Sequence, residues 1–149
     1  MKQRDRVAMA PEAAAAFLEA SRKVQLATIN RDGTPHLVTM YYVMLDGKIT
    51  FWTYRSSQKA RNLARDPRIT CLVETGNEYF DLRGVQVQGV VRTVEDPAGV
   101  LAIGRRIAGV TLNLHEGLAD DYVGHTAPKR LGYLVEPTHI ASWDHSKLQ

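Results

Sequence analysis

Hydrophobic residues recur at two-residue spacing along most of the chain and at three- to four-residue spacing in a few segments. The first helical spacing follows Pro11, where alanines together with Phe17 and Leu18 predict a helix over about residues 10–20. From Val24 onward β-branched and aromatic residues dominate. Six such segments predict strands, over residues 24–30, 36–45, 48–54, 69–74, 82–95 and 131–144.

Turn residues suggest how these strands connect. Gly33-Thr34-Pro35 separates the first two, and Asp46-Gly47 is the preferred pair for a two-residue type I′ hairpin. The first three strands are therefore expected to form an antiparallel meander. Gly89, inside the fifth strand, indicates a bulge or a close backbone approach.

Two further helices are expected between strands. One follows Ser56-Ser57 and stops at Asp66-Pro67, and the other follows Asp96-Pro97. Six short strands with few helices favour a closed or partly closed antiparallel barrel over a parallel sheet. Residues 75–81 and 109–130 give no clear pattern.

Composition places the chain among soluble globular proteins. Its 149 residues, 44% hydrophobic and 23% charged, fit one domain over residues 1–149. The single cysteine, Cys71, excludes an intramolecular disulfide and fits a thiol packed as a small apolar group in a cytoplasmic protein. The five histidines lack metal-site spacing, and no apolar run approaches the roughly 18 residues of a membrane span, so neither a metal nor a membrane is expected.

Positive charge is concentrated in one segment. The net charge is only +3, yet residues 55–68 carry five basic side chains and the single acid Asp66. A helix beginning here would direct free backbone N–H groups, the Ser57 hydroxyl and the Lys59 ammonium outward, which suits a phosphate. The alternative is a solvated basic helix face, the commoner meaning of a charge run taken alone.

The same segment resembles the pyridoxamine-phosphate-oxidase-like split β-barrels. In that superfamily a strand ends in a serine- and lysine-containing turn whose helix start holds a cofactor phosphate. The likeness extends over residues 24–94 and includes the first hairpin, with its Gly33-Thr34-Pro35 turn. Ser57, Lys59 and Asn62 match the turn and the helix of that pattern. Asp66, Pro67 and Arg68 match its entry to the next strand. The resemblance implies a mainly β, six-stranded antiparallel split barrel with a flavin-type cofactor.

Within the superfamily, the short chain and the segment KARNLARDPR are most similar to the deazaflavin-dependent reductases, which use coenzyme F420. Enzymes of the superfamily that bind FMN place arginine in the second strand and directly before the helix lysine. This sequence has Val38 and Gln58 at those positions. The resemblance therefore implies coenzyme F420, with FMN as the alternative.

The resemblance also nominates cofactor-binding residues. Ser57 and Lys59, with Arg55 and Asn62, belong to the phosphate-binding turn and helix. The cofactor would lie along the second and third strands, although the pattern alone favours plain core packing for Met40 and Trp52. Trp143 matches a tryptophan that the neighbouring subunit supplies, although it could equally be a core or interface contact. A homodimer is expected because segment 36–45 has apolar residues on both faces of the strand. The proposed wall comprises Val38, Thr39, Met40, Trp52, Thr53 and Tyr54.

The function implied is hydride transfer between the deazaflavin and a small organic electrophilic acceptor. The cofactor performs the chemistry in such a site, so no catalytic side chain is assigned. The alternatives are an FMN-dependent oxidoreductase and a non-catalytic cofactor carrier. A third is a nucleic-acid-binding barrel, because Trp52, Tyr54, Arg55 and Lys59 interleave basic and aromatic groups. A net charge of +3 argues against nucleic acid.

Overall fold

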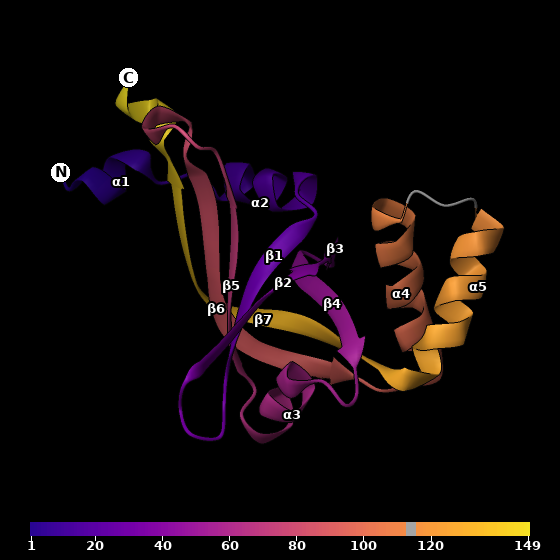
Figure 1. Ribbon diagram of the computed structural model, residues 1–149. Coiled ribbons are helices and arrows are strands. Elements are labelled where there is room, and N and C mark those ends of the chain that lie inside the picture. The colour runs from indigo at the N-terminus through magenta and orange to yellow at the C-terminus, as the bar shows by residue number, and fades with distance from the viewer. Residues whose placement is uncertain (113–115) are drawn as a thin grey trace.

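One curled antiparallel sheet forms the body of the protein. The computed structural model describes residues 1–112 and 116–149 (Figure 1). The strands stand in the order β2-β1-β5-β6-β7-β4-β3. Their bounds are β1 Lys23–Ile29, β2 Pro35–Tyr41, β3 Val43–Leu45, β4 Lys48–Tyr54, β5 Arg68–Thr75, β6 Arg83–Val94 and β7 Arg130–Asp144.

Helices lie around this sheet. Figure 1 shows α4 and α5 side by side as a hairpin next to β4, and both chain termini together at the far end of the long β6 and β7 strands. The helices are α1 Gln3–Val7, α2 Pro11–Ala20, α3 Gln58–Arg65, α4 Pro97–Thr111 and α5 Glu116–Thr126, with short 3-10 turns at Tyr79–Asp81, Ala127–Lys129 and His145–Leu148. No helix in the described part of the chain is long and apolar enough to cross a membrane.

The sheet has seven strands, not the six expected, because the segment 36–45 divides at Tyr42. The Tyr42 side chain is buried, and its hydroxyl donates a hydrogen bond of 2.5 Å to the Leu18 carbonyl of α2. Its backbone N–H donates to the Arg22 carbonyl. Anchoring this residue to α2 separates β2 from β3.

The expected three-stranded meander is wrong. The Asp46-Gly47 turn does join β3 to β4, with the expected positive φ angles of 51° and 73°. However, β4 pairs with β7, and β2 lies at the opposite end of the sheet. Residues Ile49 to Thr53 are all buried, so β4 needs a covered position on both faces, which a short exposed meander cannot provide.

The bulge expected at Gly89 is confirmed. The pairing of β6 with β7 shifts register between Gln88 and Gly89. A Cβ atom at position 89 would lie 2.1 Å from the Glu136 carbonyl oxygen, so only glycine allows this approach of the two strands.

Strand β4 connects two hydrophobic cores. Phe51 faces the barrel interior, where Cys71 is also fully buried, and burial raises the pKa of the Cys71 thiol to about 12. Trp52 faces the opposite way, into a second core formed with α4 and α5. Gly104 of α4 makes this possible, because a Cβ atom there would lie 2.4 Å from the Trp52 ring. Trp52 is thereby fixed against α4.

Candidate functional site

The start of α3 is held by hydroxyl groups. The Ser57 Oγ accepts a hydrogen bond of 3.2 Å from the Ala60 backbone N–H, which caps the helix. Thr53 donates from its Oγ1 to the same Ser57 oxygen, also at 3.2 Å. Thr53 therefore lies inside the protein and supports the cap.

Amide side chains fix α3 against the sheet. Asn62 is fully buried, and its Nδ2 donates to the Thr28 hydroxyl and to the Asn30 side-chain oxygen, each at 3.0 Å. Gln58 in turn donates from Nε2 to the Asn62 Oδ1 at 2.9 Å. Asn62 was expected to contact the cofactor, but its side chain is buried. Its hydrogen bonds to Thr28 and Asn30 instead fix the position of α3 relative to β1.

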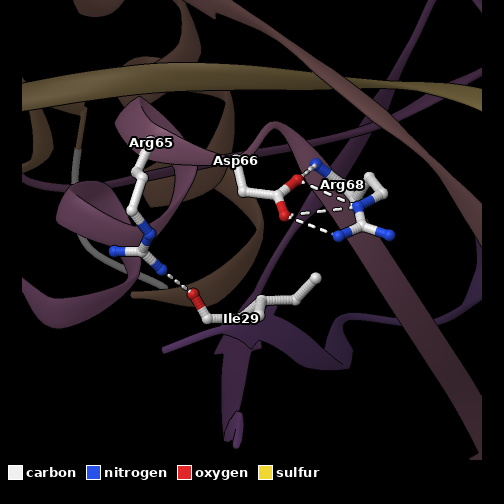
Figure 2. A network of polar contacts seen from close by, with 4 residues as sticks. All are labelled: Ile29, Arg65, Asp66 and Arg68. Carbon is white, nitrogen blue, oxygen red and sulfur yellow. Dashed lines mark hydrogen bonds and ion pairs between the residues drawn. The ribbon is translucent and has the colours of Figure 1, made fainter. Parts of the chain in front are cut away.

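The basic residues of this segment divide into two groups. Figure 2 shows the group at the end of α3, where the Arg65 guanidinium donates to the Ile29 carbonyl and Arg68 faces Asp66. The Arg68 Nη2 lies 2.8 Å from the Asp66 Oδ2, and the hydrogen bonds from Arg68 lower the pKa of Asp66 to about 2. These two arginines therefore make structural contacts at the C-terminus of α3.

Lys59 belongs to the other group, at the N-terminus of α3. Its side chain is half-buried, and within the described residues its ammonium has neither a hydrogen bond nor an ion pair. Burial lowers the pKa of Lys59 below its ordinary 10.5, and the positive charge of Arg130 lowers it further. A cation held beside a second cation and a helix N-terminus attracts an anion.

Arg130 is the site residue that the sequence analysis missed. It is only 8% exposed, and its guanidinium carbon lies 4.4 Å from the Trp52 ring centroid and 4.0 Å from that of Tyr54. Its Nη2 donates to the Tyr122 hydroxyl at 3.2 Å, while its Nε has no partner among the described residues. The pairing of β4 with β7 sets Arg130 beside Tyr54, and no sequence pattern indicated that pairing.

The curl of the sheet brings part of the expected wall together. Thr39 and Met40 of β2 and Trp52 of β4 line one cavity of about 250 Å³, although their strands stand near opposite ends of the sheet. Arg130 and Tyr122 line the same cavity. Val38 is not part of this lining, and it packs against the barrel core.

Two expected residues lie elsewhere. Arg55 lines a neighbouring cavity of about 450 Å³, which it shares with Arg130. Trp143 pairs with Gly84, and its ring lies where a Cβ of residue 84 would be. Trp143 lies thirteen positions after Arg130 on β7, which is roughly 40 Å along the strand. A role for Trp143 in this site therefore requires a second copy of the chain.

The site thus combines cations, aromatic rings and a helix N-terminus. A larger cavity of about 600 Å³ between α2 and α4 shares none of these residues. Lys59 and Arg130 suit an anionic group, and the Trp52 side of the 250 Å³ cavity suits a flat apolar one. An anionic ring compound is the kind of ligand whose chemistry such an arrangement would match.

Comparison with known proteins identifies the class of this curled half-barrel with peripheral helices. The family described as pyridoxamine 5'-phosphate oxidase matches residues 10–144, and the chain belongs to that family. A search of curated proteins finds no match.

Solved structures give particular relatives. The conserved hypothetical protein Rv2991 from Mycobacterium tuberculosis is 38% identical, with a TM-score of 0.91 over 99% of this chain and 92% of its own. A structure named F420 reductase is 27% identical, with a TM-score of 0.70 over 89% of this chain and 98% of its own. The heme storage protein HutZ from Vibrio cholerae is 15% identical, with a TM-score of 0.69 over 89% and 94%, and shares the fold.

Proposed function

We propose that this protein is an oxidoreductase that holds coenzyme F420 and transfers hydride between the deazaflavin and a small organic electrophilic acceptor. The observation that carries the proposal is the pair of cations, Lys59 and Arg130, between the N-terminus of α3 and the aromatic side chains of β4. The 27% identity to an F420 reductase supports the same assignment.

The residues present fit an anionic cofactor. Lys59 has no counter-charge among the described residues, and its ammonium is destabilised by burial and by Arg130. A phosphate beside Ser57 and Lys59 would relieve that repulsion. It would also accept hydrogen bonds from backbone N–H groups in the first turn of α3 other than that of Ala60, which the Ser57 Oγ already accepts. Thr39, Met40 and Trp52 would contact the ring system in the adjoining cavity.

Two positions favour F420 over FMN. Val38 packs against the barrel core, and the Gln58 amide is engaged with Asn62. Neither supplies the arginine that FMN-binding enzymes of the superfamily carry there. One charged hydrogen bond contributes about 1.5–3 kcal/mol, so lacking both weakens a tight mononucleotide site.

The chemistry of the proposed reaction belongs to the cofactor. When bound in its reduced form, F420 supplies a hydride from its ring carbon to the acceptor, and solvent supplies the accompanying proton. The chain binds the anionic part through Lys59 and orients the ring against Trp52. Trp52 is itself held by α4, which limits access of water on that side.

Turnover distinguishes an enzyme from a carrier. Reduced F420 is mixed without oxygen with the protein and a panel of conjugated carbonyl compounds, and the return of the oxidised deazaflavin absorbance is followed. The proposal expects multiple turnovers with at least one acceptor, and slower turnover at limiting cofactor in the Lys59→Ala variant. Stoichiometric binding of F420 without turnover would favour the non-catalytic carrier, and turnover with reduced FMN alone would favour the FMN enzyme.

A further inference from the structure

The cavity of about 450 Å³ beside the cofactor site has a charged end and an apolar body. Arg55 and Arg130 line it together with one acid, Glu95, so its charged groups carry a net positive charge. Val100, Leu101 and Pro128 supply apolar walls from α4 and from the turn that follows α5. Its volume lies within the range of about 300–1,000 Å³ that small-molecule sites occupy.

Arg130 is the group that indicates a ligand. The residue is only 8% exposed, and no carboxylate among the described residues forms an ion pair with it. Burying a charge without a counter-ion is unfavourable, and the aromatic rings and the Tyr122 hydroxyl offset this only in part. An anion in the cavity would provide the counter-charge that Arg130 lacks.

We propose that this cavity binds a small carboxylate with an apolar, aromatic or branched body. The carboxylate lies toward Arg130 and Arg55, and the body lies against Val100 and Leu101. An apolar body distinguishes this ligand from a phosphate or a polar peptide, which would leave the walls uncovered. This cavity shares Arg130 with the proposed cofactor cavity, but its other lining residues are different. The carboxylate proposal goes beyond the proposed cofactor binding, and its test does not depend on which cofactor the protein holds.

The test uses benzoate and its neutral counterpart benzamide as probes, titrated into the cofactor-free protein. The two tryptophan indole N–H signals are followed by NMR and assigned with a Trp143→Phe variant. We expect benzoate to shift the Trp52 signal, since Trp52 contacts Arg130, and to leave the Trp143 signal unchanged. Benzoate should bind at least about tenfold more tightly than benzamide, as expected of one charged hydrogen bond. Equal affinity for the two probes would overturn the proposal.

Two variants locate the site. Arg130→Met keeps an apolar stem and should abolish the preference for benzoate. Gly124→Leu should block binding while keeping Arg130, because position 124 lines the cavity and a Cβ there meets open space. Gly109→Leu is the matched control, also a helical glycine with open space, but lining the cavity between α2 and α4.

Unchanged benzoate affinity in Gly124→Leu, or an equal loss in Gly109→Leu, would overturn the assignment to this cavity. If Arg130→Met does not fold, Gly124→Leu and the benzamide comparison still decide the question. Because no cofactor is present, the result is separate from any failure of F420 binding.

Discussion

At the scale of single residues, the electrostatic role of each cation in the α3 segment depends on its burial and on the charges beside it. Lys59 and Arg61 are two residues apart on one helix, yet Lys59 is half-buried near Arg130 and Arg61 is exposed. Helical spacing alone predicts that Arg61 turns away from the helix start, and Arg61 is exposed. No local pattern could show that Lys59 lies near Arg130. Arg130 itself comes from β7, and only the β4–β7 register places it between Trp52 and Tyr54.

Replacing Lys59 with Ala should weaken F420 binding by about 1.5–3 kcal/mol, or roughly ten- to a hundredfold, because it removes the ammonium nearest the helix N-terminus. Arg61→Ala is the matched control and should change affinity by less than about threefold. Arg65→Ala is a poorer control, since it also removes the contact with the Ile29 carbonyl. Calorimetry measures the affinities and circular dichroism checks folding. Equal affinity of wild type and a folded Lys59→Ala variant would mean that the basic helix is only a solvated face without a role in cofactor binding.

Anion binding should also depend on the protonation of Lys59. Burial and Arg130 lower the pKa of Lys59, so cofactor affinity should fall as the pH rises through that lowered value, earlier than for a free lysine. Arg130→Met removes the repulsion and should raise the pKa of Lys59. NMR of lysine labelled at Cε follows this titration directly. An unchanged Lys59 titration in Arg130→Met would contradict the proximity of the two charges.

Asp66 gives a prediction for stability at low pH. Its pKa is lowered to about 2 by hydrogen bonds from Arg68, against about 3.9 in an unfolded chain. Its stabilising contribution is therefore present above the unfolded value and is lost as the pH falls through about 2. Asp66→Asn should be less stable than wild type near neutral pH, with the difference shrinking between about pH 4 and 2. Urea unfolding across this range measures it, and a difference independent of pH would refute the Asp66–Arg68 interaction.

At the scale of elements, local signals predicted much of the structure. The helix after Pro11, the Asp46-Gly47 turn and the bulge at Gly89 were all correct because each depends on nearby residues. The strand order was not predicted, since partners such as β4 and β7 are chosen by burial of both faces of β4. Helix α5 was also missed. Its polar residues Asp120 and Asp121 weaken the apolar periodicity.

The β6–β7 bulge can be tested with a matched pair of glycines. Gly89→Ala should destabilise the protein by at least about 1–3 kcal/mol, because the new Cβ would collide with the Glu136 carbonyl oxygen. Gly109→Ala should instead stabilise α4 by up to about 1 kcal/mol, because its Cβ meets open space. Thermal and urea unfolding of both variants measure the effects. An unchanged free energy of unfolding in Gly89→Ala would mean that β6 and β7 separate easily at this point.

At the scale of the whole molecule, the curled sheet brings its two ends to one cavity but leaves Trp143 far along β7. Apolar side chains remain on the outer sheet surface, with Leu37 66% and Ile140 51% exposed. A homodimer would cover such surface and allow Trp143 to approach the site of the other copy. The contacts within one copy of the chain do not test the homodimer, so the homodimer stays a prediction.

Sedimentation should give about twice the chain mass of 16.6 kDa. Ile140→Asp should shift the protein toward monomer, while Val110→Asp, an exposed apolar position on α4, should not. A monodisperse wild-type monomer at micromolar concentration would remove the proposed role of Trp143.

The most direct measurement of the central claim is a fluorescence titration of the wild-type protein with coenzyme F420 and with FMN at equal ionic strength. The cations at the start of α3, with Val38 and Gln58 in place of arginines, predict tighter binding of F420. Tighter binding of FMN, or purification of the protein as a yellow FMN complex, would contradict the account.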